Sequence, residues 1–325
     1  MKAAWYERNG AARDVLTVGD MDTPEPSPGE VRVKITVSGV NPSDVKGRRG
    51  RPLTWPRIIP HSDGAGVIDA VGDGVDHRNI GERVWLWNAQ WKRAFGTAAE
   101  YCVLAAEQAV KLPNRVEIAA GACLGIPALT ALQAVRLHGP IAGKTLLVTG
   151  AGSAVGHYAT QIAKARGARV IGTASDAKAD HARNGGADFV VDYKKKDVAK
   201  VTKELTRGEG VDGVIDMDLS ATAALIAERV VKPHGMIVCY GSNIAGDIPI
   251  SFQAMLFNSY AIKTFLVYEL KPEDRHAAIL ELTTLLEEGI LKHSIGARFR
   301  LRDIAAAHDA VEGGKVIGNV VLDVG

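Results

Sequence analysis

The sequence predicts an α/β protein of two domains, in which a doubly wound parallel sheet accompanies a second domain rich in short β-strands. Two observations lead to this fold class. The chain has 325 residues, which exceeds the usual size of a single hydrophobic core. Its hydrophobic pattern also changes near Gly125. Isolated strand-like segments precede this residue, and apolar strands alternating with helix-length segments follow it.

The first third of the chain has the pattern of a β-rich domain. Residues 31–38 alternate between apolar and polar side chains, as a half-buried strand does. Segments 64–72 and 83–87 are further strand candidates, and turn material rich in glycine and aspartate separates them. Many short strands punctuated by glycine are typical of a small barrel-like β domain.

The chain after Gly125 has the pattern of a parallel sheet covered by helices. Helices are expected over about 154–166 and 177–183. The apolar runs of strand length lie at 145–149, 169–173, 188–191, 211–216 and 236–240. Because these runs are continuously apolar, both faces of the sheet should be covered.

The last part of the chain is expected to return to the first domain. An amphipathic helix over about 272–288 and a final strand over 319–323 follow Lys263. The predicted domains are therefore residues 1–124 together with 264–325, which form the β-rich domain, and residues 125–263, which hold the parallel sheet.

The composition excludes several classes of function. A formal net charge of +2 is too close to neutral for a protein built around a polyanion, so no nucleic-acid partner is expected. Cys102, Cys123 and Cys239 lack the spacing of a zinc ribbon, a redox motif or a disulfide framework. There is no apolar stretch of about 18 residues and no signal-peptide pattern. A reduced, soluble, cytoplasmic protein without a membrane partner is therefore expected.

A glycine-rich segment lies between the strand at 145–149 and the helix that follows. It reads Gly150-Ala-Gly152-Ser153-Ala154-Val155-Gly156. Glycine permits φ > 0 and leaves no Cβ between the backbone and a pyrophosphate, and a helix N-terminus offers unpaired N–H groups to an anion. The spacing has one residue more than G-x-G-x-x-G. In this strand–turn–helix context, the segment predicts a Rossmann-type dinucleotide site.

The residues after the next strand favour NADPH over NADH as the cofactor. An NAD site usually carries an acidic residue at the end of this strand, which binds the ribose 2′-hydroxyl, whereas Ala174 stands here. Ser175 and Lys178 follow, in positions to bind a 2′-phosphate. Asp176 lies between them and would repel the phosphate if it pointed inward. Its alternative role is to cap the next helix.

The order of these features resembles a known superfamily. A β-rich domain containing Gly39-Val-Asn41-Pro-Ser-Asp44 and Gly64-Ala-Gly66 precedes a Rossmann domain, and the chain then returns to the first domain. Over essentially the whole chain this is similar to the medium-chain dehydrogenases/reductases and, among them, to the zeta-crystallin-like NADPH:quinone oxidoreductases. The resemblance implies a GroES-like catalytic and substrate domain and a homodimer or homotetramer.

The residues at the zinc-ligand positions of this superfamily argue against a metal. Asn41 stands where the zinc alcohol dehydrogenases carry a cysteine, Ser62-Asp63 stand where they carry a His-Glu pair, and Ile126 lies near their second cysteine ligand. Such a set cannot form a tetrahedral zinc site, which needs thiolate, imidazole or carboxylate donors. Residues 86–101 also lack the four cysteines of the structural zinc lobe, and His61 is one residue out of register. No metal is predicted.

The resemblance also implies which residues surround the cofactor. Asn41 would line the cleft over the nicotinamide as the catalytic hydrogen-bond donor. Its alternative role is to stabilise its own loop. The phosphate loop departs from the family's usual Gly-Gly-Val-Gly at Ser153 and Ala154. The predicted cofactor-binding residues are Thr130, Gly150, Gly152, Ser153, Ala154, Val155, Gly156, Ser175, Lys178, Tyr193, Tyr240, Gly241 and Ser242.

Three functions remain open at this point. Without zinc, the chain lacks the Lewis acid that stabilises an alkoxide, so hydride transfer to an electrophilic quinone is expected. Reduction of an activated C=C bond in an enone or enal needs the same cofactor geometry. A non-enzymatic, crystallin-like NADPH-binding protein is the third possibility. Lys46, Arg48 and Arg49 replace aromatic residues often found in the family's first substrate loop, and these cations could favour an acceptor with a negative group.

Overall fold

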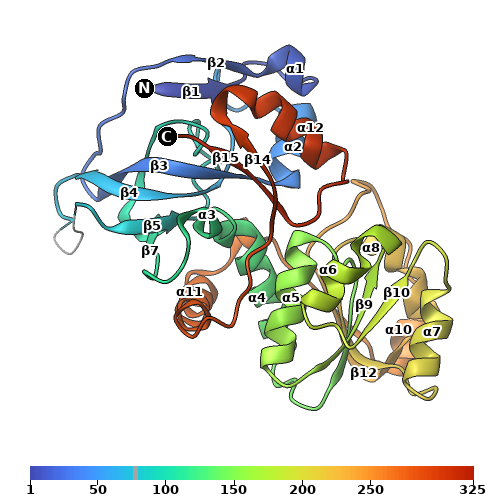
Figure 1. Cartoon of the computed structure of the whole chain (residues 1–325). Helices are drawn as coiled ribbons and strands as arrows, with labels where there is room; N and C mark the ends of the chain where they lie inside the picture. Colours follow the sequence, from blue (N-terminus) through green and yellow to red (C-terminus); the bar gives the residue numbers. More distant parts are fainter. Residues whose placement is uncertain (76–79) are drawn as a thin grey trace. The chain divides into compact units, whose positions relative to one another are not determined.

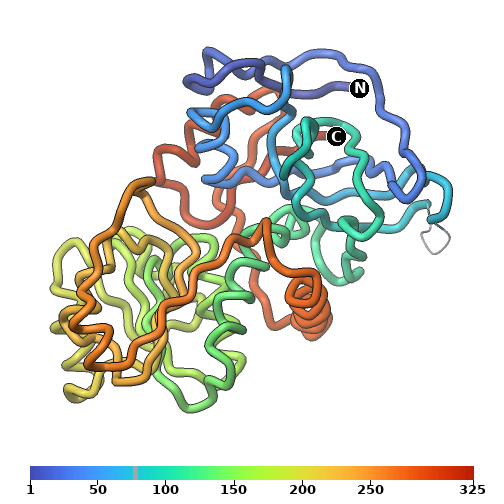
Figure 2. Tube along the Cα trace, turned by 180° about the vertical axis from the view of Figure 1, so that it is seen from behind, coloured from blue at the N-terminus to red at the C-terminus, as the bar shows by residue number. Residues whose placement is uncertain are grey.

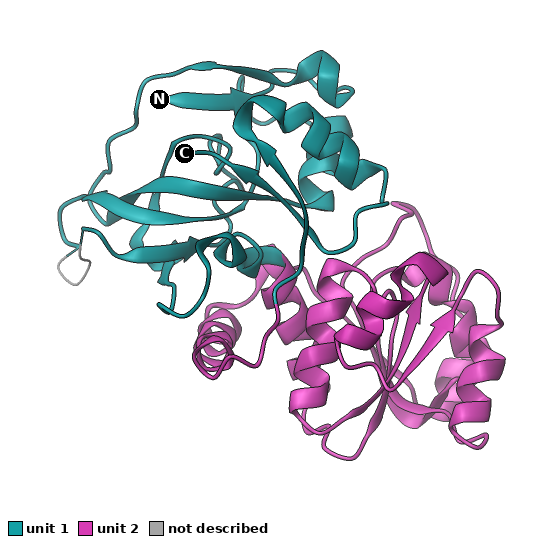
Figure 3. Ribbon diagram, in the orientation of Figure 1, with its two compact units in different colours: residues 1–126, 293–325 teal, residues 127–292 magenta. Residues whose placement is uncertain are grey.

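The computed structural model describes residues 1–75 and 80–325, which form two compact units. Unit 1 consists of Met1–Ile126 and His293–Gly325, and unit 2 consists of Pro127–Lys292 (Figure 3). Both termini belong to unit 1 (Figure 2). Within the described ranges, no helix combines the length and the hydropathy needed to cross a membrane.

The boundary after the parallel sheet differs from the expected one. Residues 264–292, which the sequence analysis assigned to the β-rich domain, belong to unit 2. The reason is the helix α11 (Pro272–Glu287), which packs against α4 (Leu129–Leu137). Glu281 of α11 also pairs with Arg136 at 2.9 Å and with Arg166. The chain returns to unit 1 only at His293.

Unit 1 is built around a seven-stranded sheet in which β3 (Glu30–Val40) is the longest strand. It pairs in antiparallel fashion with β4 (Asp63–Val71), β6 (Tyr101–Ala105) and β15 (Asn319–Asp323). The other strands of this sheet are β5 (Arg83–Leu86), β7 (Ala109–Lys111) and β14 (Ile295–Arg300). β1 (Lys2–Trp5) and β2 (Thr17–Asp20) form a separate pair. The β-rich domain expected from the sequence is confirmed.

The core of unit 1 follows from the alternation in β3. Val31, Val33 and Ile35 are buried in one apolar cluster with Ile68 and Leu104 from the neighbouring strands. The helices of this unit are α1 (Ala12–Val15), α2 (Pro42–Gly50), α3 (Ile118–Gly121) and α12 (Ile304–Glu312). The first turn of α2 begins with Pro42, whose fixed φ suits this position of a helix.

Unit 2 contains a six-stranded, entirely parallel sheet (Figure 1). Its spatial order is β10 (Phe189–Asp192), β9 (Arg169–Ala174), β8 (Thr145–Val148), β11 (Val211–Asp216), β12 (Val231–Cys239) and β13 (Ala261–Thr264). Numbered within the unit, the order is 3-2-1-4-5-6, the arrangement of dinucleotide-binding Rossmann domains. The sequence predicted the first five strands but not β13. The doubly wound α/β fold is confirmed.

Helices cover both faces of the parallel sheet. α5 (Ala154–Ala165) packs against β8 and β9, α7 (Val198–Leu205) against β10, and α10 (Phe252–Asn258) against β12. The other short helices are α6 (Ala179–Asn184), α8 (Leu219–Thr222) and α9 (Ala224–Ala227). Because the inner strands β8, β9 and β11 are largely buried on both sides, their continuous apolar runs carry no alternation.

Candidate functional site

The turn between β8 and α5 brings three glycines close to neighbouring atoms. Gly150 has a φ of +64°, which favours glycine, and a Cβ there would lie 1.9 Å from Met217 Sδ. A Cβ on Gly156 would lie 2.1 Å from the carbonyl oxygen of Gly150, and one on Gly152 would lie 2.7 Å from the Cβ of Lys178. The three glycines therefore allow the turn to pack tightly against the ends of β9 and β11.

The helix α5 begins directly after this turn. Ser153 is the N-cap, and its hydroxyl oxygen accepts the N–H of Gly156 at 3.1 Å. Ala154 and Val155 begin the helix, where backbone N–H groups have no acceptor within the helix. These groups and the positive end of the helix dipole suit a pyrophosphate.

A cavity of about 390 Å³ opens at the carboxyl ends of the strands. Residues at or beyond the carboxyl ends of five strands line it, among them Gly150 after β8, Thr173 in β9, Met217 after β11 and Asn243 after β12. Tyr193, which follows β10, completes this side of the cavity. β8 and β11 are neighbours at the point where the strand order reverses, and ligands of doubly wound sheets bind outside the carboxyl ends at this point.

Two aspartates that the sequence analysis missed hold the loops around this cavity. Asp216 is fully buried and accepts from the hydroxyls of Thr149 and Thr222, both at 2.7 Å. Burial raises the pKa of its carboxyl. Asp218 accepts from the backbone N–H of Asn243 at 3.0 Å and from its side-chain amide at 2.5 Å. The loops after β11 and β12 are therefore tied together. Two acidic residues directly after a buried strand were the available signal in the sequence.

The predicted 2′-phosphate residues lie after β9 and β10, at one edge of the sheet. Ser175 is the N-cap of a 3₁₀ turn over Asp176–Lys178. Burial, and then the nearby charge of Lys194, lowers the pKa of Lys178. Tyr193 is about half exposed. Asp176 does not cap the next helix, contrary to one of its two expected roles, because the N-cap position of α6 is Lys178 and the Asp176 carboxylate accepts from Lys195 instead.

The remaining predicted cofactor residues lie at the ends of other elements of unit 2. Tyr240 follows β12, its ring is tilted against Phe265 at 6.4 Å between centroids, and its hydroxyl is buried with no hydrogen bond among the described residues. A Cβ on Gly241 would lie 2.6 Å from the carbonyl oxygen of Met217. The Ser242 hydroxyl donates to the carbonyl of Ile244.

Thr130 differs from the other predicted cofactor residues in its position. It is buried in α4 and does not line the cavity described above. Gly150 and Tyr193 are the predicted residues that this cavity brings together. The role of every one of these residues towards a cofactor stays a prediction.

In unit 1, two buried carboxyl groups hold Asn41. Asp44 accepts the backbone N–H of Asn41 at 2.7 Å, and Asp63 accepts from its side-chain amide at 2.8 Å. Burial raises the pKa of Asp44 to about 7 and the pKa of Asp63 well above its usual range, in spite of these hydrogen bonds. Asn41 thus stabilises its own loop, the second of its two expected roles. Its catalytic role stays a prediction.

His61 is a buried structural residue. Its Nε2 lies 2.9 Å from Nε2 of His308, its Nδ1 lies 2.9 Å from the Ser38 hydroxyl, and burial lowers its pKa well below the usual range. In the part of the chain that the structure describes, no three histidine, cysteine or acidic side chains come together as a metal site. The amide of Asn41 and the hydroxyl of Ser62 are also poor donors for zinc.

The expected role of the cations near Asn41 does not fit the structure at Arg48 and stays a prediction at the exposed Lys46 and Arg49. Arg48 is fully buried and pairs with Glu312 at 2.8 Å, and Arg49 pairs with the same carboxylate. Their charges are therefore partly neutralised within unit 1. The idea that they attract a negative group on the substrate was wrong for Arg48, because a fully buried guanidinium is not available to a ligand.

Two family models match the chain, one for each kind of domain. The alcohol dehydrogenase GroES-like domain matches residues 27–114. The zinc-binding dehydrogenase model matches residues 154–284. These two matches fall on the β-rich sheet of unit 1 and on the parallel sheet of unit 2.

Curated relatives match over almost the full chain. The quinone oxidoreductase of Pseudomonas aeruginosa is 33% identical and the match covers 95% of each chain. The 2-haloacrylate reductase of a Burkholderia species is 30% identical, over 99% of this chain and 98% of that protein. Both relatives are named as reductases or oxidoreductases, of different substrates.

Solved structures share the whole fold. An NAD-dependent alcohol dehydrogenase has a TM-score of 0.89 and 31% identity, with all of both chains covered. A mycobacterial protein complexed with NADPH has a TM-score of 0.88 and 28% identity, with 99% of both chains covered. The parallel sheet, the glycine turn and these likenesses agree on an oxidoreductase that binds a nicotinamide dinucleotide. The chain belongs to the quinone oxidoreductase family of the medium-chain dehydrogenases/reductases.

Proposed function

We propose that this oxidoreductase transfers hydride from NADPH to a quinone and that it does so without zinc. The cofactor proposal rests mainly on the end of β9, at the edge of the parallel sheet. This strand ends in Ala174 instead of an acidic residue. Lys178 lies beside the glycine turn, close to Gly152. Lys194 is near enough for its charge to lower the pKa of Lys178. Positive charge therefore gathers where the 2′-phosphate of NADPH would bind.

The residues of unit 2 suffice to hold such a cofactor. The glycine turn and the N-terminus of α5 would bind the pyrophosphate, and Ser175, Lys178 and Tyr193 would bind the 2′-phosphate. Tyr240, Gly241, Ser242 and Thr130 would contact the nicotinamide half, as the family resemblance implies. A bound nicotinamide would supply the hydride, which is the difficult step of the chemistry.

The contribution of unit 1 is a fixed hydrogen-bond donor. Asp63 and Asp44 hold Asn41 in one orientation, so its amide would be preorganised to donate to an acceptor oxygen on which negative charge develops. A quinone takes up one hydride and one proton to become a hydroquinone, and the proton would come from solvent. Its carbonyls are already electrophilic, so this reaction needs no Lewis acid.

Reduction of an activated C=C bond is the second candidate function. The observation in its favour is the full-length similarity to a 2-haloacrylate reductase. The two functions share the hydride donor and differ in the shape of the acceptor pocket. A protein that binds NADPH without turning it over is the third possibility, and any substrate-dependent oxidation of NADPH would exclude it.

Steady-state assays separate these functions. We expect NADPH oxidation with an ortho- or para-quinone or with a conjugated enone, and no oxidation of a primary alcohol with NADP⁺. An alcohol must lose a proton as it loses hydride, and the amide, hydroxyl and hydrocarbon at the ligand positions cannot assist as zinc does. Alcohol turnover without turnover of either electrophile would refute the proposed mechanism.

A homodimer through unit 2 is a further part of the proposal. β13 is the last strand of the parallel sheet, and an exposed strand edge is a template for pairing with another chain. Phe252, Leu256 and Phe257 of the neighbouring α10 are between 60% and 74% exposed. Light scattering should show a dimer or tetramer, and Phe257→Glu should shift it towards the monomer. A monomeric wild-type protein would refute this part.

A further inference from the structure

Asp176 opposes the binding of NADPH in the proposed site. It is the first residue of the 3₁₀ turn after β9, two positions before Lys178. A carboxylate in this position would repel a 2′-phosphate and would suit the 2′-hydroxyl of NADH instead. The structure provides a partner for it.

That partner is Lys195, in the loop after β10. Its Nζ lies 2.9 Å from Asp176 Oδ2 and 3.7 Å from Asp192 Oδ2. β10 and β9 are parallel neighbours with Asp192 opposite Ala174, so the loops after both strands emerge side by side at the same edge of the sheet. The pairing of Asp176 with Lys195 therefore follows from the sheet register, although 19 positions separate the two residues.

Both partners are charged in this arrangement. The hydrogen bond from Lys195 and its positive charge lower the pKa of Asp176, and the same contacts raise the pKa of Lys195. Both side chains are largely exposed, at 78% and 64%. Solvent weakens such a pair. The charge of Lys195 nevertheless offsets a negative charge at the place where a doubly charged phosphate would bind.

We propose that Lys195 is a specificity-determining residue that acts through Asp176: it masks the carboxylate and so permits NADPH to bind in preference to NADH. This inference rests on the proposed function, in which NADPH is the cofactor. Without Lys195, Asp176 repels the 2′-phosphate and becomes available to accept the 2′-hydroxyl of NADH. Lys178 remains the direct phosphate ligand in either case.

The test is a double-mutant cycle on cofactor binding. NADPH and NADH are titrated by nicotinamide fluorescence into the wild type, Lys195→Ala, Asp176→Asn and the double variant. The measured quantity is the preference, the Kd of NADH divided by the Kd of NADPH. Lys195→Ala should lower it by about 5- to 20-fold, through weaker NADPH binding, because an unmasked carboxylate then faces the phosphate. NADH binding should stay within about twofold or tighten.

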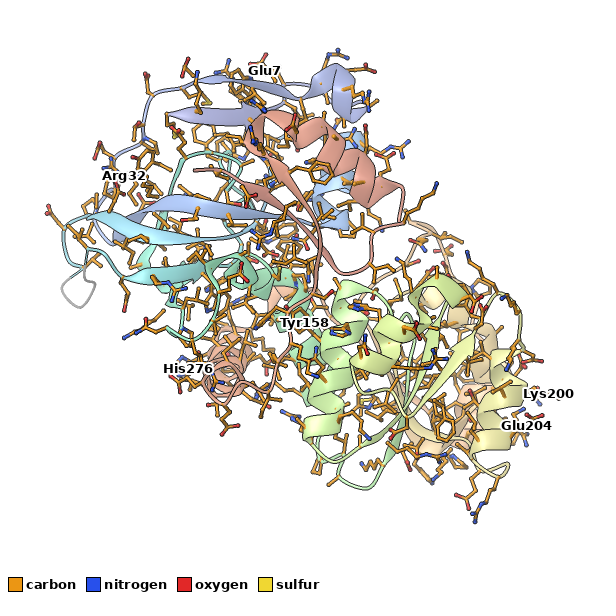
Figure 4. The ribbon with its side chains drawn as sticks, in the orientation of Figure 1. Glu7, Arg32, Tyr158, Lys200, Glu204 and His276 are labelled. Atoms are coloured by element: carbon orange, nitrogen blue, oxygen red, sulfur yellow. The ribbon has the colours of Figure 1, made fainter. Side chains whose placement is uncertain are left out.

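The double variant distinguishes the proposed role from a direct one. It has the same net charge as the wild type and lacks the Asp176 carboxylate that Lys195 is proposed to mask, so its preference should return to within about twofold of the wild-type value. Lys200→Ala, on α7, is the matched control for the loss of one lysine charge (Figure 4), and it should leave the preference unchanged. Because residues 176 and 195 are exposed, circular dichroism should show that all these variants fold.

Two results would overturn the inference. A preference that survives Lys195→Ala would show that Lys195 has no part in selectivity. An equal loss of the preference for NADPH in Lys195→Ala and in the double variant would show that Lys195 does not act through Asp176. A wild-type protein that binds NADH as tightly as NADPH would instead refute the proposed cofactor, so the two failures are distinguishable.

Discussion

Gly156→Ala should destabilise the protein and weaken its cofactor binding. The new Cβ would lie 2.1 Å from the carbonyl oxygen of Gly150 and 2.9 Å from the Cα of Ala151. Ordinary contact needs about 3.4 Å or more, so α5 would have to move away from the turn by about 1 Å. Overpacking of this kind costs about 1–3 kcal/mol or more, and the better helix propensity of alanine recovers about 1 kcal/mol. We expect a net loss of about 1–2 kcal/mol in the free energy of unfolding.

The same displacement should separate the N–H groups of α5 from the turn that presents them. NADPH affinity should therefore fall by about tenfold or more, the equivalent of about one lost charge-assisted hydrogen bond. Urea denaturation measures the first effect and fluorescence titration the second. Gly246→Ala is the matched control, because a Cβ there would meet only Ile244 Cγ2 at 4.0 Å. A Gly156→Ala variant with wild-type stability and affinity would refute the assigned role of the turn.

Three further predictions concern charge and metal. In titrations, Lys178→Ala should weaken NADPH binding by about 1–3 kcal/mol and leave the affinity for NADH nearly unchanged. Equal losses of affinity for both cofactors would show that Lys178 does not recognise the 2′-phosphate. The pKa of Asp44 is raised to about 7 in the folded state, so the folded state binds the additional proton between about pH 4 and pH 7. The contribution of Asp44 to stability should therefore fall as the pH rises through this range and level off above it. Denaturation of the wild type and Asp44→Asn at pH 5 and pH 8 should show a smaller fall in stability in the variant, because Asp63, whose pKa is also raised, contributes to the slope in both proteins. Elemental analysis of protein purified without a metal-affinity tag should find no stoichiometric zinc, and one zinc per chain would contradict the interpretation of Asn41, Ser62 and Ile126.

The sequence predicted those parts of the fold that local patterns determine. A strand, a glycine turn and a helix follow one another between Thr145 and Ala165, and each has its own signal: an apolar run, residues that tolerate positive φ, and an N-cap. The parallel sheet has the strand order of the Rossmann-type domain that the glycine-rich segment predicted. These features depend on residues that are close along the chain.

The sequence could not predict contacts between distant residues. The amphipathic pattern of α11 shows that the helix buries one face but not which unit it packs against, and the ion pairs of Glu281 with Arg136 and Arg166 decide this in favour of unit 2. The pair between His61 and His308 spans 247 positions. The ion pair of Asp176 likewise depends on Lys195, in the loop after another strand. In each case a charge or a ring nitrogen meets its partner only through the tertiary structure.

The loop around Asn41 shows how the missing zinc ligands and the proposed chemistry fit together. A zinc ion would place a positive charge at this position, which favours an alkoxide and therefore alcohol oxidation. Asn41 supplies a neutral amide instead, and burial favours the uncharged forms of Asp44 and Asp63 that hold it. A hydride arriving at a quinone brings negative charge to the acceptor oxygen, and a neutral hydrogen-bonded cluster opposes this charge less than two buried carboxylates would. The raised pKa values of these two carboxyls are therefore consistent with reduction of an electrophile and give no help to the removal of a proton from an alcohol.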